Sequence, residues 1–447
     1  MSIFSKRPSG MNAFYTIWVG QFFSLLGTGM TRFALTLWAW ELTGSATALA
    51  FVAFFGFLPS IVMSPIAGAL VDRWDRKLVM MLSDLAAGVG TILLLILSLN
   101  GSLVLWHVYA ITFVAGMFES FQFPAYSAAI TTMVSKDHYA RTSAMLGLAN
   151  SASNIFAPIT AASLYGLLSL NGILALDIVT FVIAYGTLLF VKIPAVKRSA
   201  EGADSQSGVW QEISYGFRFI WNRKSLFWLQ TAFFFANFVF GMAIVLTNPM
   251  ILARTGNNET ILGIVSACMA GGGFVGGLLM SAHGGFKERR VRGVLWGFMA
   301  SGLLGTVVLG AGQTILFWVI GAFAQSAFLS PINASNQAIW QSKVPPDVQG
   351  KVFAARRVIA AISTPAAMII GGLLADYVFE PAMQANGALA PIFGGLVGTG
   401  DGAGMGLMFV FVGLATVVIG LVAYSAPIIR DVETIVPDFD PNLVAES

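Results

Sequence analysis

The stretch that decides the fold is Gly68-Ala-Leu-Val-Asp72-Arg73-Trp74-Asp75-Arg76-Lys77. Five of its last six residues are charged, whereas charged residues make up only 10% of the whole chain. Long apolar runs lie on both sides of it, and charge at this density is stable only where water reaches it. The stretch is therefore expected to form a short loop at one face of a membrane, between two helices that cross the bilayer.

The composition supports a membrane protein. Hydrophobic residues make up 57% of the chain, and the mean hydropathy is +0.79. Soluble domains are roughly 45–50% apolar, so an aqueous fold could not cover this much apolar surface. A helix needs about 20 mostly apolar residues to cross a bilayer, whereas a barrel strand needs about ten. We expect an all-α protein with twelve transmembrane helices, near residues 12–38, 46–70, 78–98, 104–129, 142–168, 172–193, 225–252, 260–282, 292–311, 314–340, 353–378 and 404–428.

Basic residues indicate which loops face the cytoplasm. They gather before the first predicted helix, in every loop from an even to an odd helix, and after the last helix. Cytoplasmic loops collect Lys and Arg because basic segments cross membranes poorly, so both termini are expected inside the cell. Arg32 and Arg254 are the exceptions. The net charge of +3 follows from this orientation and gives no indication of nucleic-acid binding.

The apolar pattern breaks once, near the middle of the chain. Residues 196–224 are rich in Ser, Gly, Gln and charge, and they end in an amphipathic segment, Trp210–Trp221. We expect six-helix bundles over 1–195 and 225–429, joined by a cytoplasmic linker whose helix lies on the inner membrane surface. Residues 430–447 are expected to form a cytoplasmic tail.

An internal repeat supports two similar halves. The sequence Val134-x-x-Asp137-x-x-Ala140-Arg141 after predicted helix 4 is echoed by Val344-x-x-Asp347-x-x-Gly350-Lys351 after predicted helix 10. Such a repeat is typical of transporters built from duplicated bundles.

The pattern G-x-x-x-D-R-x-x-R-K in Gly68–Lys77 resembles the loop between helices 2 and 3 of the major facilitator superfamily of secondary transporters, although that family usually has Gly at the position of Asp75. Leu37–Ser45, Phe121–Tyr126 and Val344–Asp347 extend the similarity to the drug-export branch that includes macrolide efflux proteins and the enterobactin exporter. The resemblance implies two pseudo-symmetric bundles that rock around a central site. It also implies proton-coupled export of drugs, siderophores or similar metabolites from a bacterial inner membrane.

The charged loop is expected to act as a gate. Asp72 would cap or pair with a helix of the other half, and the basic residues would pair with acids such as Asp84, which together would hold the outward-facing state. The alternative is that these charges only set the topology. The residues assigned to the gate are Gly68, Asp72, Arg73, Arg76 and Lys77.

Predicted helix 5 resembles the proline-containing motif associated with exporters of the superfamily, with Ala or Ser at each expected glycine. The alternative is ordinary packing of small residues, which lets helices approach closely. The residues of this motif are Ala144, Ser153, Ala157, Pro158, Ala161 and Ala162.

Three ionisable residues inside the predicted helices are candidates for coupling: Arg32, Glu119 and Asp177. Such groups are costly in a bilayer and are functional candidates by default. Glu119 is favoured as the carboxylate that binds a proton, and Asp177 is as easily a fixed hydrogen-bonded group. From the predicted helix ends, Arg32 and Glu119 differ in depth by more than about 10 Å, so a direct pair is not expected.

Helices 1, 4, 7 and 10 line the cavity in this family. Aromatic rings with a few amides on these helices favour a bulky amphipathic substrate over a sugar. The cavity candidates are Gln21, Phe22, Gln122, Tyr126, Gln230, Phe234, Asn237, Gln325, Asn333 and Asn336.

No enzyme activity, cofactor or metal site is expected. The glycines of Gly398–Gly406 lack the βαβ context of a nucleotide site, and the chain has no phosphate-binding loop sequence, so an ion gradient is expected to drive transport. His107, His138 and His283 are scattered, and Cys268 is the only cysteine.

The expected partners are the lipid bilayer, a small-molecule substrate and protons, and the protein is expected to be a monomer. Two other functions stay open: a flippase for lipids or lysophospholipids, and a membrane sensor or scaffold that transports nothing.

Overall fold

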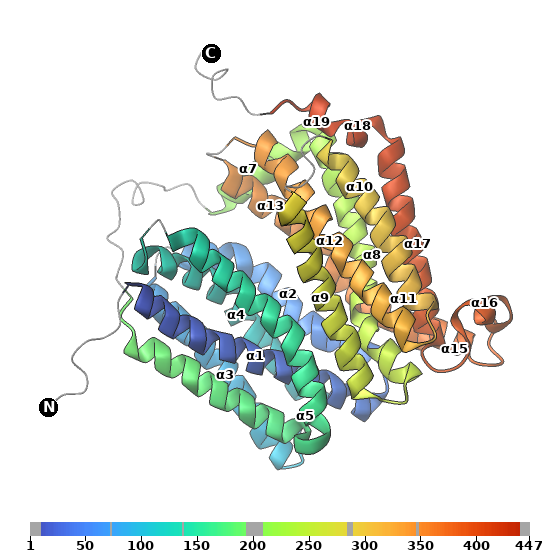
Figure 1. Ribbon diagram of the computed structural model, residues 1–447, viewed down its shortest axis with the longest axis horizontal. Coiled ribbons are helices and arrows are strands. Elements are labelled where there is room, and N and C mark those ends of the chain that lie inside the picture. The colour runs from blue at the N-terminus through green and yellow to red at the C-terminus, as the bar shows by residue number, and fades with distance from the viewer. Residues whose placement is uncertain are drawn as a thin grey trace. The chain divides into compact units, whose positions relative to one another are not determined.

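The computed structural model describes residues 10–71, 74–135, 138–193, 209–283, 289–345 and 348–438 (Figure 1). All regular structure within these ranges is helical, as predicted. Nine helices in the described ranges are long and apolar enough to cross a membrane. The all-helical membrane fold is thereby confirmed, whereas the number of twelve helices stays a prediction.

The chain divides into two compact units, of which the first contains Met1–Gly44, Phe51–Gln206 and Asn258–Ala267. Its longest helix is broken at Ser169, where φ is 51° and ψ is −174°, between the two helices that the sequence predicts there. The helices that contribute to this unit are α1 (Gly10–Thr43), α2 (Ala46–Val71), α3 (Arg76–Leu99), α4 (Leu105–Met133) and α5 (Tyr139–Phe190).

Helix α1 packs closely along α5 because small residues face each other. A Cβ atom on Gly27 would lie 2.2 Å from Oγ1 of Thr180, and one on Gly29 would lie 2.8 Å from Cβ of Ala157. These short separations let short polar side chains of α1 reach neighbouring helices, which matters for the site described below.

The second unit contains Ser45–Ala50, Ser207–Asn257 and Cys268–Ser447. Helices α4 and α12 are each 29 residues long and each end at a valine in extended conformation, as the internal repeat suggests. The helices that lie wholly in this unit are α7 (Val209–Asn222), α8 (Lys224–Arg254), α10 (Arg290–Ala300), η2 (Ser301–Val307), α11 (Val308–Ala311), α12 (Ile315–Lys343), α13 (Gln349–Ala361), α14 (Ser363–Leu374), η3 (Ala375–Phe379), α15 (Glu380–Met383), α16 (Ala390–Val397), α17 (Ala403–Ser425), α18 (Pro427–Arg430) and α19 (Val432–Ile435). Helix α9 (Glu259–His283) belongs to the first unit up to Ala267 and to the second from Cys268.

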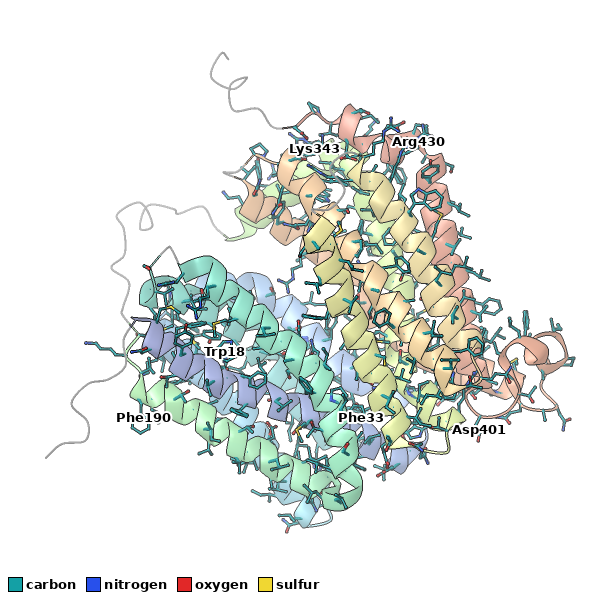
Figure 2. The ribbon with its side chains drawn as sticks, viewed as in Figure 1. Trp18, Phe33, Phe190, Lys343, Asp401 and Arg430 are labelled. Atoms are coloured by element: carbon teal, nitrogen blue, oxygen red, sulfur yellow. The ribbon has the colours of Figure 1, made fainter. Side chains whose placement is uncertain are left out.

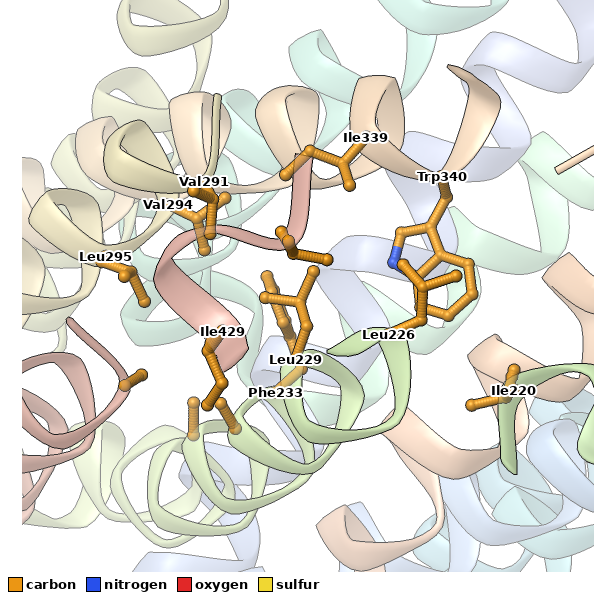
Figure 3. Close-up of a cluster of buried hydrophobic side chains, with 14 of the residues drawn as sticks. Ile220, Leu226, Leu229, Phe233, Val291, Val294, Leu295, Ile339, Trp340 and Ile429 are labelled. Atoms are coloured by element: carbon orange, nitrogen blue, oxygen red, sulfur yellow. The ribbon is translucent and has the colours of Figure 1, made fainter. Parts of the chain in front are cut away.

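The amphipathic helix predicted in the linker is α7, and it packs into the second unit. Phe219 and Ile220 are buried in the core that also holds Leu229 and Trp340 (Figure 3). A Cβ atom on Gly216 would lie 2.3 Å from the carbonyl oxygen of Lys351, so α7 touches the backbone of α13. Burial of its apolar face thus fixes the end of the linker to the second unit.

The segment after η3, which includes the glycines of Gly398–Gly406, contains the short helices α15 and α16 and is held by Arg254. The guanidinium donates to the carbonyl oxygens of Gly402, Gly312 and Val397. Gly398 and Gly402 have φ of 78° and 80°, a conformation that favours glycine. Arg254 departs from the charge pattern of the other basic residues because it satisfies backbone carbonyls at one end of the unit.

The opposite end of the second unit is closed by the C-terminal segment. Figure 2 shows Lys343 and Arg430 at one end and Asp401 at the other. The buried Lys343 donates to the carboxylate of Asp438 at 2.7 Å and to the carbonyl oxygen of Glu433 at 2.7 Å. The hydrogen bond from Lys343 lowers the pKa of Asp438 below its usual value. The described part of the predicted tail is therefore attached to the bundle.

Asp376 caps the first turn of α2, which belongs to the second unit as part of Ser45–Ala50. Its carboxylate accepts from Oγ of Ser45 at 2.6 Å and from the backbone N–H groups of Ala46 and Thr47 at 3.0 and 2.8 Å. An anion at a helix N-terminus satisfies N–H groups that lack an intrahelical partner and interacts favourably with the helix dipole.

We predict that Asp376→Ala destabilises the protein by about 1 kcal/mol, the usual value of a lost N-terminal cap. Thermal unfolding in detergent measures the change, and Asp401→Ala is the matched control because it removes an exposed acid of the same unit. Equal unfolding midpoints for the two variants would contradict a stabilising cap.

Candidate functional site

Asp84 lies at the centre of a buried polar cluster in the first unit. Its carboxylate accepts from Nε2 of Gln21 at 2.8 Å and from Nε2 of Gln122 at 2.8 Å. The same nitrogen of Gln122 lies 3.1 Å from Oε1 of Gln21, so the three side chains, from α1, α3 and α4, form a closed triangle. Neutral amides, and not a cation, thus hold a buried acid in an apolar helix bundle.

The cluster also contains polar atoms without a partner. Oε1 of Gln122 and the hydroxyl of Tyr126 are buried and make no hydrogen bond. Tyr126 follows Gln122 by one helical turn, so both side chains lie on the same face of α4. An unpaired buried acceptor is costly, and this one belongs to the same amide whose nitrogen donates to Asp84.

Asp177 is held by three threonine hydroxyls. Its carboxylate accepts from Thr31 at 2.9 Å, Thr91 at 3.1 Å and Thr28 at 3.5 Å, which come from α1 and α3. The side chain is buried, and it joins three helices of the first unit. This arrangement fits the structural role that the sequence left open for Asp177.

Arg32 and Glu119 form an ion pair, contrary to the estimate from the predicted helix ends. Nη2 of Arg32 lies 2.5 Å from Oε2 of Glu119, and both side chains are more than half exposed. The estimate was wrong because α1 continues to Thr43, five residues beyond its predicted end, which places Arg32 about 7 Å deeper. The long arginine side chain spans the remaining difference.

The charged loop binds the ends of neighbouring helices in the first unit. Arg76 donates to the carbonyl oxygen of Ala128 at 2.6 Å, and Lys77 donates to that of Val191 at 2.7 Å. Asp75 caps α3 by accepting from the N–H group of Leu78. Basic groups are stabilising at helix C-termini because unpaired carbonyls gather there.

Two of the assigned gate residues, Asp72 and Arg73, lie outside the described residues, and Gly68 lies within α2. Arg76 and Lys77 bind backbone carbonyls and Asp84 binds two amides, so the expected pairing of these two cations with Asp84 was wrong. Asp84 lies eight residues into α3 from Arg76, about 12 Å along the helix, where the amides of the cluster reach it first.

The small residues of the helix 5 motif serve close packing. Oγ of Ser153 donates to the carbonyl oxygen of Leu25 at 2.9 Å. A Cβ atom on Gly263 would lie 2.9 Å from Cβ of Ala162 and 3.3 Å from the carbonyl oxygen of Pro158, which lies inside α5. Ala157 and Ala161 are buried, and the side chain of Ala144 lies outside the described residues.

The second unit contains a cavity of about 370 Å³. Four of the predicted cavity residues line it, together with two arginines from α13 that the sequence analysis did not select. The lining residues are Gln230, Phe233, Asn237, Asn333, Asn336, Gln337, Phe353, Arg356, Arg357 and Ala360.

Three other predicted cavity residues lie elsewhere. Phe22 stacks on Trp18 with ring centroids 5.8 Å apart. The carbonyl oxygen of Phe234 accepts from Ser363, and its neighbour Phe233 faces the cavity instead. Gln325 is buried and donates to Oγ1 of Thr306, so it holds the π-helical segment η2 against α12.

A family model described as Major Facilitator Superfamily matches residues 17–293. The chain belongs to the major facilitator superfamily. The match covers more than half of the chain, and the helical architecture agrees with it. Membership places the chain among membrane transporters and not among enzymes.

Curated relatives and solved structures agree with this membership. The chain is 29% identical to macrolide efflux protein A of Streptococcus pyogenes over 81% of this chain and 89% of that protein. It is 27% identical to the multidrug efflux pump Tap of Mycolicibacterium fortuitum over 78% of this chain and 86% of that protein.

Two solved structures share the fold at low sequence identity. A bacterial homologue of the human lysosomal transporter Spinster has a TM-score of 0.67 at 14% identity, over 96% of this chain and 99% of that one. A bacterial homologue of the iron transporter ferroportin has a TM-score of 0.65 at 13% identity, over 92% of this chain and 100% of that one.

Sequence reasoning missed Asp84 and Arg356 as site residues of this superfamily member for the same reason. Each lies near a predicted helix end, so Asp84 was taken as a partner of the adjacent charged loop, and Arg356 was counted among the basic residues around the loop after predicted helix 10. Helix α13 begins at Gln349, four residues before the predicted start at 353, which places Arg356 about two turns inside the helix. An ionisable residue more than one turn inside an apolar helix is the signal that could have found both.

We predict that Thr31→Val destabilises the protein by about 1.5–3 kcal/mol, because it removes a 2.9 Å hydrogen bond to a buried carboxylate. Thr28→Val is the matched control, since its hydroxyl lies 3.5 Å from the same carboxylate and contributes far less. Denaturation in detergent measures both variants. Equal losses would show that packing, and not the bond to Asp177, accounts for the change.

Proposed function

We propose that the protein is a proton-coupled exporter of bulky amphipathic compounds, such as drugs or siderophores. The relatives named as efflux proteins support export, and the superfamily supports secondary transport. We place the protein in a bacterial inner membrane with both termini in the cytoplasm, because basic residues concentrate in the loops that this orientation puts inside.

The observation that carries proton coupling is the environment of Asp84. A carboxylate that binds and releases a proton during transport must be satisfied in both states. When ionised, it accepts the two amide N–H groups seen in the structure. When protonated, it needs an acceptor, and Oε1 of Gln122 is buried and without a partner. An amide offers both a donor and an acceptor, so this cluster suits either state of the acid.

Glu119 fits this role less well than Asp84. Its carboxylate already has a charged partner, the guanidinium of Arg32, and both side chains are more than half exposed, whereas Asp84 is buried. We assign the Arg32–Glu119 pair to contact with substrate or water, because both side chains are more than half exposed. Asp84 therefore replaces Glu119, the acid that the sequence favoured, as the proposed site of the coupled proton.

The charged loop supports a gate built on a fixed base. Arg76 and Lys77 attach the loop to α4 and to the end of α5. A contact made by Asp72 would therefore be coupled to several helices of the first unit. We propose that Asp72 makes the state-dependent contact and that the neighbouring cations anchor the loop. The helix 5 motif supports this rigidity through close packing of α1 and α5.

For Asp84→Asn, we predict that exchange of a labelled macrolide across proteoliposomes at equal pH stays within about twofold of wild type, whereas stimulation by a pH gradient is lost. Asparagine keeps the size of the side chain and, with one acceptor and an N–H donor, imitates the protonated acid, but it cannot bind or release a proton. Glu119→Gln is the matched control and is expected to keep the stimulation. If Glu119→Gln loses the stimulation by the pH gradient and Asp84→Asn keeps it, Glu119 and not Asp84 binds the coupled proton.

A second prediction separates a transporter from a sensor or scaffold. Asp72→Asn is expected to lower macrolide efflux from cells by at least about tenfold at an unchanged amount of membrane protein, whereas Asp75→Asn, which weakens only the cap of α3, is expected to have a small effect. Efflux at the wild-type rate in Asp72→Asn would contradict a gating role for Asp72.

A further inference from the structure

Arg356 is a cation without an anionic partner in the cavity of the second unit. Its Nη2 donates to Oε1 of Gln337 at 2.5 Å, while Nη1 is buried and has no hydrogen-bond partner. Among the residues that the structure describes, no acid lies within ion-pair distance of it. A guanidinium has five N–H donors in a planar fork that matches a carboxylate or phosphate, so one arm of this fork is unused.

Aromatic rings hold the guanidinium in place. Its central carbon lies 5.2 Å from the ring centroid of Phe353 and 5.5 Å from that of Trp340. Contact with ring faces fixes the position of a cation but supplies no hydrogen-bond acceptor. The guanidinium is thus positioned in advance and its unused donor remains unsatisfied.

The rest of the lining adds a donor, a second cation, apolar surface and one unpaired acceptor, Oε1 of Gln230. Oδ1 of Asn336 already accepts from Nε1 of Trp340, so its NH₂ group is what it can offer to a ligand. Arg357 adds a second positive charge to the lining, where the described residues include no acid. Phe233, Phe353 and Ala360 form an apolar wall.

We propose that this cavity binds an anionic group, a carboxylate or a phosphate, carried on an apolar body, with Arg356 as its main ligand. The proposal rests on the proposed function, because the anionic compound would be the cargo. A cationic group would face two arginines with no compensating acid among the lining residues, so the cavity selects against it. The cavity volume lies within the range of small-molecule sites.

The test is equilibrium binding by calorimetry to the purified full chain in phosphatidylcholine nanodiscs. The probes are 2-naphthoate and its neutral analogue 2-naphthamide, which share a ring system and differ in charge. Wild type is expected to bind the carboxylate more tightly than the amide. Arg356→Gln is expected to weaken naphthoate binding by about ten- to hundredfold and to leave naphthamide binding within about twofold.

Two further variants make the result specific. Arg218→Gln removes an exposed arginine of α7 outside the cavity and is expected to bind naphthoate like wild type. Arg356→Lys keeps the charge without the fork and is expected to be intermediate, which also controls for folding. Wild-type affinity for naphthoate in Arg356→Gln, or equal losses for both probes, would overturn the proposal.

Nanodiscs that contain phosphatidylglycerol distinguish the source of the anion. If wild type binds naphthoate more weakly in these discs than in phosphatidylcholine discs, and Arg356→Gln shows no such difference, the site binds a lipid headgroup, as a flippase would require. Equal affinity in both discs assigns it to a soluble anion. Equilibrium binding needs neither a gradient nor transport, so a failure of macrolide export would leave this result standing, and a failure here would leave export standing.

Discussion

The structure depends on one constraint: polar groups on membrane helices need partners within the protein, because lipid offers none. Asp177 takes three threonine hydroxyls, Arg32 takes Glu119, and Arg254 takes three backbone carbonyls. Arg76 and Lys77 satisfy the ends of helices in the same way. These contacts join helices that are distant in the sequence, and the small residues between α1 and α5 bring the helices close enough for short side chains to meet.

Function is proposed at two of the places where this constraint is not met. Oε1 of Gln122 beside Asp84 lacks a donor, and Nη1 of Arg356 lacks an acceptor. A proton on the carboxylate would satisfy the first atom, and an anion in the cavity would satisfy the second. In each unit the proposed site thus contains a buried polar atom whose partner would be a transported species, a proton in one unit and an anionic compound in the other.

The sequence predicted the helices well because long apolar runs have few alternatives to membrane helices. It also selected Gln21, Gln122 and Asn336 as polar residues of interest. It could not show that Gln21 and Gln122 meet at Asp84, since that contact depends on how three helices converge. Backbone acceptors have no signature in the sequence, so the partners of Arg76 and Arg254 were out of reach. An error of a few residues in a helix end was enough to misplace Arg32 and Arg356.

Infrared difference spectroscopy on the protein in membranes can show whether Asp84 binds the coupled proton. A protonated carboxylic acid has a C=O stretch that an ionised carboxylate lacks. If Asp84 binds the proton, such a band appears at low pH, disappears as the pH rises, is absent in Asp84→Asn and persists in Glu119→Gln. A pH-dependent band that survives in Asp84→Asn would contradict this role of Asp84.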